Sequence, residues 1–130
     1  MSHAKAGTLG WVDLTVSDAA RARDFYAAVC DLTPRDHAMG DYADFDMIGA
    51  EGAVVTGVCH AKGANAGVPP VWIPYFTVAA LDGAVAEATR RGATLLDHRP
   101  MPVGLAILRD PDGATFGLLQ AQGPSDGALA

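Results

Sequence analysis

Cysteine, positive charge and long apolar runs are all scarce in this sequence. There are two cysteines, Cys30 and Cys59, and they lack the Cys-x-x-Cys spacing of zinc and redox motifs. Nine basic residues against fifteen acidic ones give a net charge of −6, which opposes binding to nucleic acid or to an anionic membrane. No apolar run reaches the roughly 18 residues of a membrane span, and the N-terminus has no signal-peptide core. These absences predict a cytoplasmic protein without nucleic-acid or membrane partners.

Two similar patterns follow one another along the chain. Residues 9–16 (LGWVDLTV) and 71–78 (VWIPYFTV) each alternate as half-buried strands do. Each is followed by apolar residues at helical spacing, with Ser17 or Asp18 placed to cap the first helix and Asp82 to cap the second. Short strand-like segments with glycine turns complete both patterns. The order strand, helix, strands is therefore repeated.

The spacing of the repeat is nearly constant. Trp11 aligns with Ile73 at an offset of 62 residues, and Thr56 aligns with Gly117 at an offset of 61. A constant spacing across both ends indicates a duplicated βαβββ unit. Half of the residues are hydrophobic, which is enough for a continuous core in a chain of 130 residues.

The domain organisation follows from this repeat. We predict a single domain whose repeats span about 7–61 and 69–122, followed by a flexible tail at 123–130. The stretch Asp110–Gly113 (DPDG) lies between two apolar runs, which is typical of a hairpin between two strands.

The fold class expected from these patterns is α+β. Each helix would cover the outer face of its sheet, and the opposite faces of the two curved, mixed sheets would form a cup between them. Strand alternation predicts which residues line the cup and bind a ligand there: Trp11, Asp13, Thr15, Thr56, Val58, His60, Ile73, Tyr75, Thr77, Gly117 and Leu119.

Three segments together resemble a known family. They are DLTVSDAARARDFYAAV, YFTVAALDGAVAEATRRGATLL and LRDPDGATFGLLQ, which with their connections cover about residues 7–122. This combination resembles the vicinal oxygen chelate superfamily of glyoxalases, bleomycin-resistance proteins and extradiol dioxygenases. GWVDLTV and PPVWIPYFTV are most similar to a glyoxalase-like branch that is loosely labelled as hydroxylases. The resemblance implies the paired βαβββ fold and its cup.

The resemblance also implies where a metal would bind. In metal-dependent members, four inward His, Gln or Glu side chains hold one divalent cation. Those positions fall here on Trp11, Thr56, Ile73 and Gly117, none of which is a good metal ligand. We therefore expect no metal or other cofactor. A divalent metal is the alternative.

Other residues could replace the missing metal ligands. Asp13, Glu51 and His60 could bind a metal together, or Asp13 and His60 could act as an acid/base pair. Structural roles are the preferred interpretation, for Asp13 through bonds to neighbouring groups and for His60 by facing solvent.

The expected function is binding of a small organic molecule in the cup, with Trp11 offering a stacking surface for an aromatic compound. The alternative is an enzyme of the glyoxalase (lyase or isomerase) or dioxygenase type, either through a substitute metal site or through acid/base catalysis by Tyr75 and Asp13. A third possibility is a structural dimer with a filled cup.

We also expect a homodimer, because the sheets leave edges and apolar residues for a second copy to cover. The apolar residues expected to remain uncovered are Trp72, Phe76 and Phe116.

Overall fold

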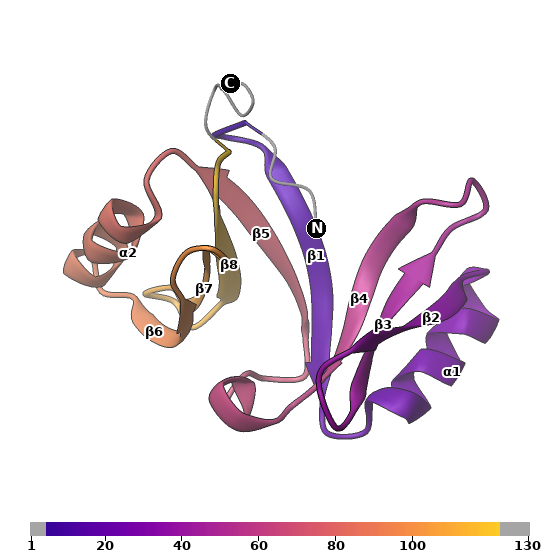
Figure 1. Cartoon of the computed structure of the whole chain (residues 1–130). Helices are drawn as coiled ribbons and strands as arrows, with labels where there is room; N and C mark the ends of the chain where they lie inside the picture. The colour runs from indigo at the N-terminus through magenta and orange to yellow at the C-terminus, as the bar shows by residue number, and fades with distance from the viewer. Residues whose placement is uncertain (1–4, 123–130) are drawn as a thin grey trace. The chain divides into compact units, whose positions relative to one another are not determined.

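The computed structural model describes residues 5–122, which form the strands and helices shown in Figure 1. Their order is β1 (Leu9–Val16), α1 (Ala19–Cys30), β2 (Thr33–Ala38), β3 (Ala43–Ile48), β4 (Val54–His60), the short 3-10 helix η1 (Gly63–Asn65), β5 (Trp72–Val78), α2 (Leu81–Arg90), β6 (Thr94–Arg99), β7 (Leu105–Arg109) and β8 (Thr115–Gln120). This is βαβββ twice, so the predicted α+β class and the predicted pair of βαβββ units are confirmed. The cup between the two sheets stays a prediction.

The described residues divide by their contacts into two compact units. Val12–Trp72 forms one, named here the N-terminal unit, and the described residues before Val12 and after Trp72 form the other, the C-terminal unit. The first residues of β1 belong to the C-terminal unit, where the amide of Gly7 donates to the carbonyl of Thr77 and the amide of Thr77 donates to the carbonyl of Thr8, both at 2.8 Å. The predicted tail at 123–130 lies outside the described residues.

In the N-terminal unit, β1 pairs in parallel with β4, and β4, β3 and β2 pair antiparallel in turn. Helix α1 starts where expected, because the Asp18 carboxylate accepts a hydrogen bond from the amide of Arg21 at 3.1 Å. The helix covers one face of the sheet, where Ala19 packs with three buried residues of β3 and β4, namely Phe45, Met47 and Val58.

The C-terminal unit repeats this arrangement. β5 pairs in parallel with β8, and β8, β7 and β6 pair antiparallel in turn. The predicted hairpin is confirmed: the Asp110 carboxylate accepts from the amides of Asp112 and Ala114 at 2.9 Å, and Gly113 has a φ of 94°. Helix α2 covers the face that carries Ala106 and Leu108.

The predicted capping role of Asp82 is wrong. Helix α2 begins two residues earlier than this cap would place it, at Leu81, and its N-cap residue Ala80 has no side-chain hydrogen bond. The amide of Leu81 donates instead to the side-chain oxygen of Gln120 at 2.8 Å, 39 residues away in sequence. Asp82 thus lies in the first turn of α2, where its negative charge interacts favourably with the positive end of the helix dipole.

The two units differ by one residue in strand β4. The pairs Asp13–Gly57 and Tyr75–Gly117 are equivalent in the two units, which gives an offset of 60 at this strand and not 61. The extra residue is Val55. Met47 of β3 pairs with Thr56 and Ile48 pairs with Val54, so Val55 between them has no partner on β3. It forms a bulge, in which one residue of a strand has no partner opposite.

This shift corrects the face predicted for Thr56, Val58 and His60. A slip of one residue turns every side chain of a strand to the other face of the sheet. Val58 pairs with Leu14 and Phe45 and is buried in the core under α1, and Thr56 and His60 share its parity. Gly57 and Cys59 therefore lie on the face that carries Asp13 and Thr15.

Within the described residues, neither helix is long and apolar enough to cross a membrane. Both cysteines are free thiols, Cys30 exposed at the end of α1 and Cys59 partly buried in β4.

Candidate functional site

The C-terminal unit brings its predicted site residues together on the face of the sheet away from α2. The pairs Tyr75–Gly117 and Thr77–Leu119 lie side by side on β5 and β8, and Ile107 of β7 follows next to Gly117. All five residues are buried. Around these residues the face also carries polar groups, namely Thr115 of β8 and the buried Asp97 of β6, which pairs with Ile107.

Gly117 and Tyr75 fit each other closely. A Cβ atom built on Gly117 would lie within 2.7 Å of three carbon atoms of the Tyr75 ring. The ring therefore occupies the space into which any side chain at position 117 would extend. The family resemblance assigns a metal-binding side chain to this position. Such a side chain could not be accommodated while Tyr75 keeps its present conformation.

The hydroxyl group of Thr77 is the most deeply buried polar group of this face. Thr77 is 1 % exposed, and its Oγ1 atom has no hydrogen-bond partner within the part of the chain that the structure describes. Leaving a buried hydroxyl unsatisfied costs on the order of 1–3 kcal/mol. By contrast, Thr56, another buried strand threonine that was assigned to the site, donates its hydroxyl hydrogen to the carbonyl of Val12.

The two tryptophans have different environments. Trp11 lies in the part of β1 that belongs to the C-terminal unit and is partly buried. Trp72 packs in the N-terminal unit, where its Nε1 donates to the Tyr26 hydroxyl at 3.2 Å and the two rings meet edge to face at 4.9 Å. Trp72 is therefore not left uncovered for a second copy, contrary to expectation.

The face of the N-terminal unit away from α1 carries acidic groups around a thiol. Asp13, Asp44 and Asp46 raise the pKa of Cys59, although burial of the thiol raises it more than any of these charges does. Cys59 therefore stays protonated at neutral pH, and a protonated thiol is a poor nucleophile.

His60 contacts Asp44, a residue that the sequence analysis did not consider. The Oδ1 atom of Asp44 lies 2.8 Å from the backbone nitrogen of His60 and 3.3 Å from its ring Nδ1. Sequence reasoning missed Asp44. The signal was available, because Asp44 and Asp46 alternate with the buried Phe45 and Met47 along β3.

The residues present do not fit a metal ion. In the described chain, no group of three or more His, Cys, Asp or Glu side chains is placed to hold one. Correcting the register moves the position equivalent to Gly117 from Thr56 to Gly57, which offers no ligand either. Glu51 is exposed in the turn before β4.

Comparison with known proteins identifies relatives of this chain. The glyoxalase-like domain family matches residues 11–119. CFP32 of Mycobacterium tuberculosis, which has a provisional glyoxylase name, is 30% identical over 129 residues, covering 92% of this chain and 48% of the relative. The anthracycline biosynthesis protein DnrV of Streptomyces peucetius is 31% identical over 117 residues, covering 88% and 42%. The chain thus spans about half the length of the curated relatives it matches.

Solved structures share the fold. Methylmalonyl-CoA epimerase from Mycobacterium tuberculosis matches with a TM-score of 0.57 at 12% identity, covering 95% of this chain and 93% of the epimerase. The hypothetical protein BH1468 from Bacillus halodurans matches with a TM-score of 0.56 at 11% identity, covering 92% and 97%. At this identity, the matches show a common fold and carry no argument about activity.

Proposed function

Because this chain belongs to the glyoxalase-like domain family, within the vicinal oxygen chelate superfamily, we propose that it binds a small organic molecule and does so without a metal ion. The proposed contact surface is the face of β5 and β8 around Tyr75, Thr77 and Gly117. Apolar walls with a few polar groups are typical of small-molecule sites, which enclose most of their ligand.

The observation that carries this proposal is the buried Thr77 hydroxyl. A polar group that stays unsatisfied in a native fold calls for an explanation, and a ligand that supplies the missing partner is one. The hydroxyl can donate to a carbonyl or ether oxygen of the ligand and can also accept a hydrogen bond. The ligand expected from this surface is therefore mainly apolar, with one polar atom positioned for Thr77.

Two further observations support the details. The Tyr75 ring over Gly117 leaves no room for a side-chain metal ligand there, which supports binding without metal. The partly buried Trp11 belongs to the same unit and offers an aromatic surface for stacking. Two of the relatives are named for anthracycline biosynthesis, which supports an organic compound as the class of ligand.

The test uses anthraquinone-2-sulfonate, an aromatic probe with two carbonyl oxygens. In a Trp72→Phe background, Trp11 is the sole tryptophan, and its fluorescence should be quenched as the probe binds. Thr77→Val keeps the shape of the side chain and removes its hydroxyl. It should weaken binding about fivefold, since one hydrogen bond contributes about 1 kcal/mol and 1.4 kcal/mol corresponds to a factor of ten.

Thr56→Val is the matched control. Its hydroxyl is satisfied by Val12, so this variant should lower the melting temperature, whereas Thr77→Val should leave it unchanged or raise it. Equal probe affinity in the Thr77→Val variant would contradict the proposed contact. Absence of quenching in the Trp72→Phe protein would contradict aromatic binding beside Trp11.

A further inference from the structure

In the N-terminal unit, one carboxylate fixes the position of one imidazole. Asp44 near the start of β3 accepts a hydrogen bond from the His60 amide at the end of β4, and the same oxygen atom lies 3.3 Å from Nδ1 of the His60 ring. The Asp44 side chain is 11% exposed and that of His60 is 20% exposed. The carboxylate is thus almost enclosed, while the imidazole remains accessible.

This contact determines which ring nitrogen carries the proton in neutral His60. Nδ1 faces a carboxylate oxygen, so the favourable tautomer has its hydrogen on Nδ1 and donates it to Asp44. Nε2 then keeps its lone pair and can accept a proton. When it does, the imidazolium that forms is stabilised by the adjacent Asp44 charge.

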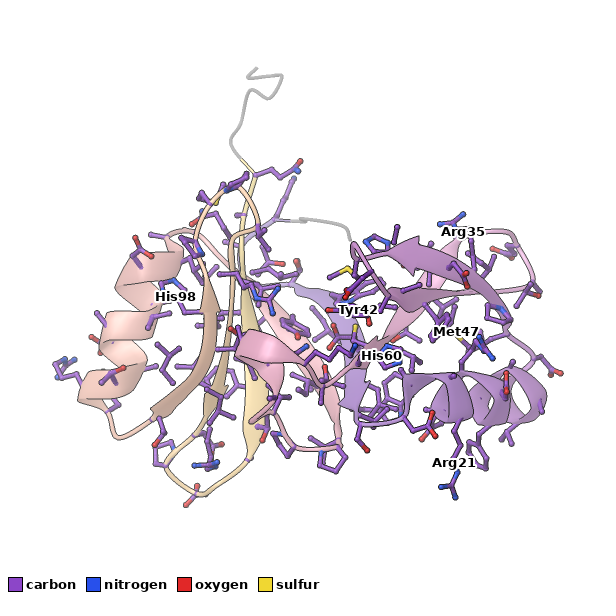
Figure 2. The ribbon with its side chains drawn as sticks, turned by 60° about the horizontal axis from the view of Figure 1, so that its bottom comes forward. Arg21, Arg35, Tyr42, Met47, His60 and His98 are labelled. Carbon is purple, nitrogen blue, oxygen red and sulfur yellow. The ribbon has the colours of Figure 1, made fainter. Side chains whose placement is uncertain are left out.

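The surroundings of His60 restrict its motion and supply a positive charge. Tyr42 contacts the His60 ring edge to face, with ring centroids 5.6 Å apart, and both residues are labelled in Figure 2. The Lys62 ammonium lies 4.3 Å from the centroid of the same Tyr42 ring. Asn65 fixes the backbone between His60 and Lys62, since it donates to the carbonyl of His60 at 3.1 Å and accepts from the amide of Lys62 at 2.6 Å.

We propose that His60, oriented by Asp44, is a catalytic base that removes a proton from a weakly acidic C–H bond of a small organic molecule. The proton moves to Nε2, the electron pair of the broken C–H bond stays on the substrate, and the imidazolium is paired with Asp44. Lys62 then balances the negative charge on the substrate. This activity is independent of the binding face in the C-terminal unit.

The N-terminal unit contains a second histidine beside a carboxylate, and this pair is more exposed to solvent than His60 and Asp44. His37 also faces a carboxylate, with its Nδ1 3.4 Å from Asp46, but its side chain is 57% exposed and Arg35 shares the same carboxylate oxygen at 3.2 Å. Water competes for both groups there, so the orientation of His37 is weakly determined. His37 is therefore the matched control for His60.

The experiment uses 5-nitrobenzisoxazole, whose ring opens when a base removes the proton on its carbon. The N–O bond breaks, its electron pair goes to oxygen, and a coloured nitrophenolate forms, so no other reactant is needed. The protein should accelerate this reaction above the rate in buffer. Other titratable or charged groups near His60 and its partners include Tyr42, Cys59 and Lys62, Asp13 of β1, Asp46 of β3, and Arg23 of α1 over the Phe45 ring.

Three variants decide the outcome. His60→Ala should lower the rate to that of buffer, Asp44→Asn should lower it about tenfold, as loss of an orienting partner often does, and His37→Ala should leave it unchanged. His60→Gln, which has a more similar volume, replaces His60→Ala if the latter melts early. A His60 variant that folds and keeps the full rate would overturn the proposal, as would a wild-type rate no higher than that of buffer.

A nitrogen NMR measurement tests the orientation without any substrate. Neutral His60 should carry its hydrogen on Nδ1 in the wild-type protein and lose this preference in Asp44→Asn. Hydrogen predominantly on Nε2 in the wild-type protein would also overturn the proposal, because the nitrogen away from Asp44 could then accept no proton.

Discussion

Gly117→Ala should destabilise the protein although it adds a single methyl group. In an extended strand, replacing glycine by alanine normally stabilises by about 0.4–1 kcal/mol, because the unfolded chain loses freedom. Here the new Cβ atom would lie within 2.7 Å of three Tyr75 ring atoms, and Tyr75 is 2% exposed, so the ring has little room to move. Overpacking of a dense core costs about 1–3 kcal/mol. Subtracting the gain from the cost, we expect a net loss of about 1 kcal/mol.

A double-mutant cycle makes this reasoning specific to the contact. Tyr75→Ala alone should cost about 3–5 kcal/mol through the cavity it leaves. In that background Gly117→Ala no longer meets a ring, so it should cost almost nothing, and the two changes should be clearly non-additive. Gly83→Ala in α2 is the control, because its Cβ would meet no atom closer than 3.9 Å and alanine favours a helix by about 1 kcal/mol.

The assay is urea unfolding of the four proteins of the cycle and of the Gly83→Ala control. Additive losses, or a Gly117→Ala protein as stable as the wild type, would refute the close packing of Tyr75 on Gly117.

Two further predictions concern the thiols and the assembly. At pH 8.5 iodoacetamide should modify Cys30 and spare Cys59, as measured by mass spectrometry, because burial and then Asp13, Asp44 and Asp46 raise the pKa of Cys59; equal modification of both would contradict this. Since the folded protein keeps that proton while the unfolded chain releases it, Cys59 should lower stability as pH rises above about 8.5. We also propose a homodimer, supported by exposed Phe25, Val29 and Phe76 and by relatives about twice as long. Light scattering should give twice the chain mass of 13.4 kDa, and a concentration-independent monomer would refute it.

Much of the fold could be predicted from local patterns. Alternation identified β1 and β5, and the turn at Asp110–Gly113 identified the last hairpin, because both signals depend on near neighbours in sequence. The register of β4 could not be predicted in the same way. Gly52 to Gly57 is one residue longer than Gly113 to Gly117, and the bulge that absorbs this residue changes which side chains share a face.

In the candidate site too, features set by near neighbours in sequence could be predicted, and contacts between distant segments could not. The residues Tyr75, Thr77, Gly117 and Leu119 share one face of their sheet, as alternation implies, since no bulge interrupts the pairing of β5 with β8. The contact of His60 with Asp44 was not predicted. Asp44 lies 16 residues earlier in sequence and reaches His60 through the pairing of β3 with β4, which alternation alone does not determine.

The different caps of the two helices have a consequence for the order of folding. Asp18 caps α1 from three residues away, so the start signal of this helix is available as soon as the local chain forms a turn. The first amide of α2 binds Gln120, the last residue of β8, and this contact requires closure of a loop of 39 residues. The first turn of α2 can therefore reach its native stability only after the final strand has docked, whereas α1 can contribute to the folding nucleus from the outset.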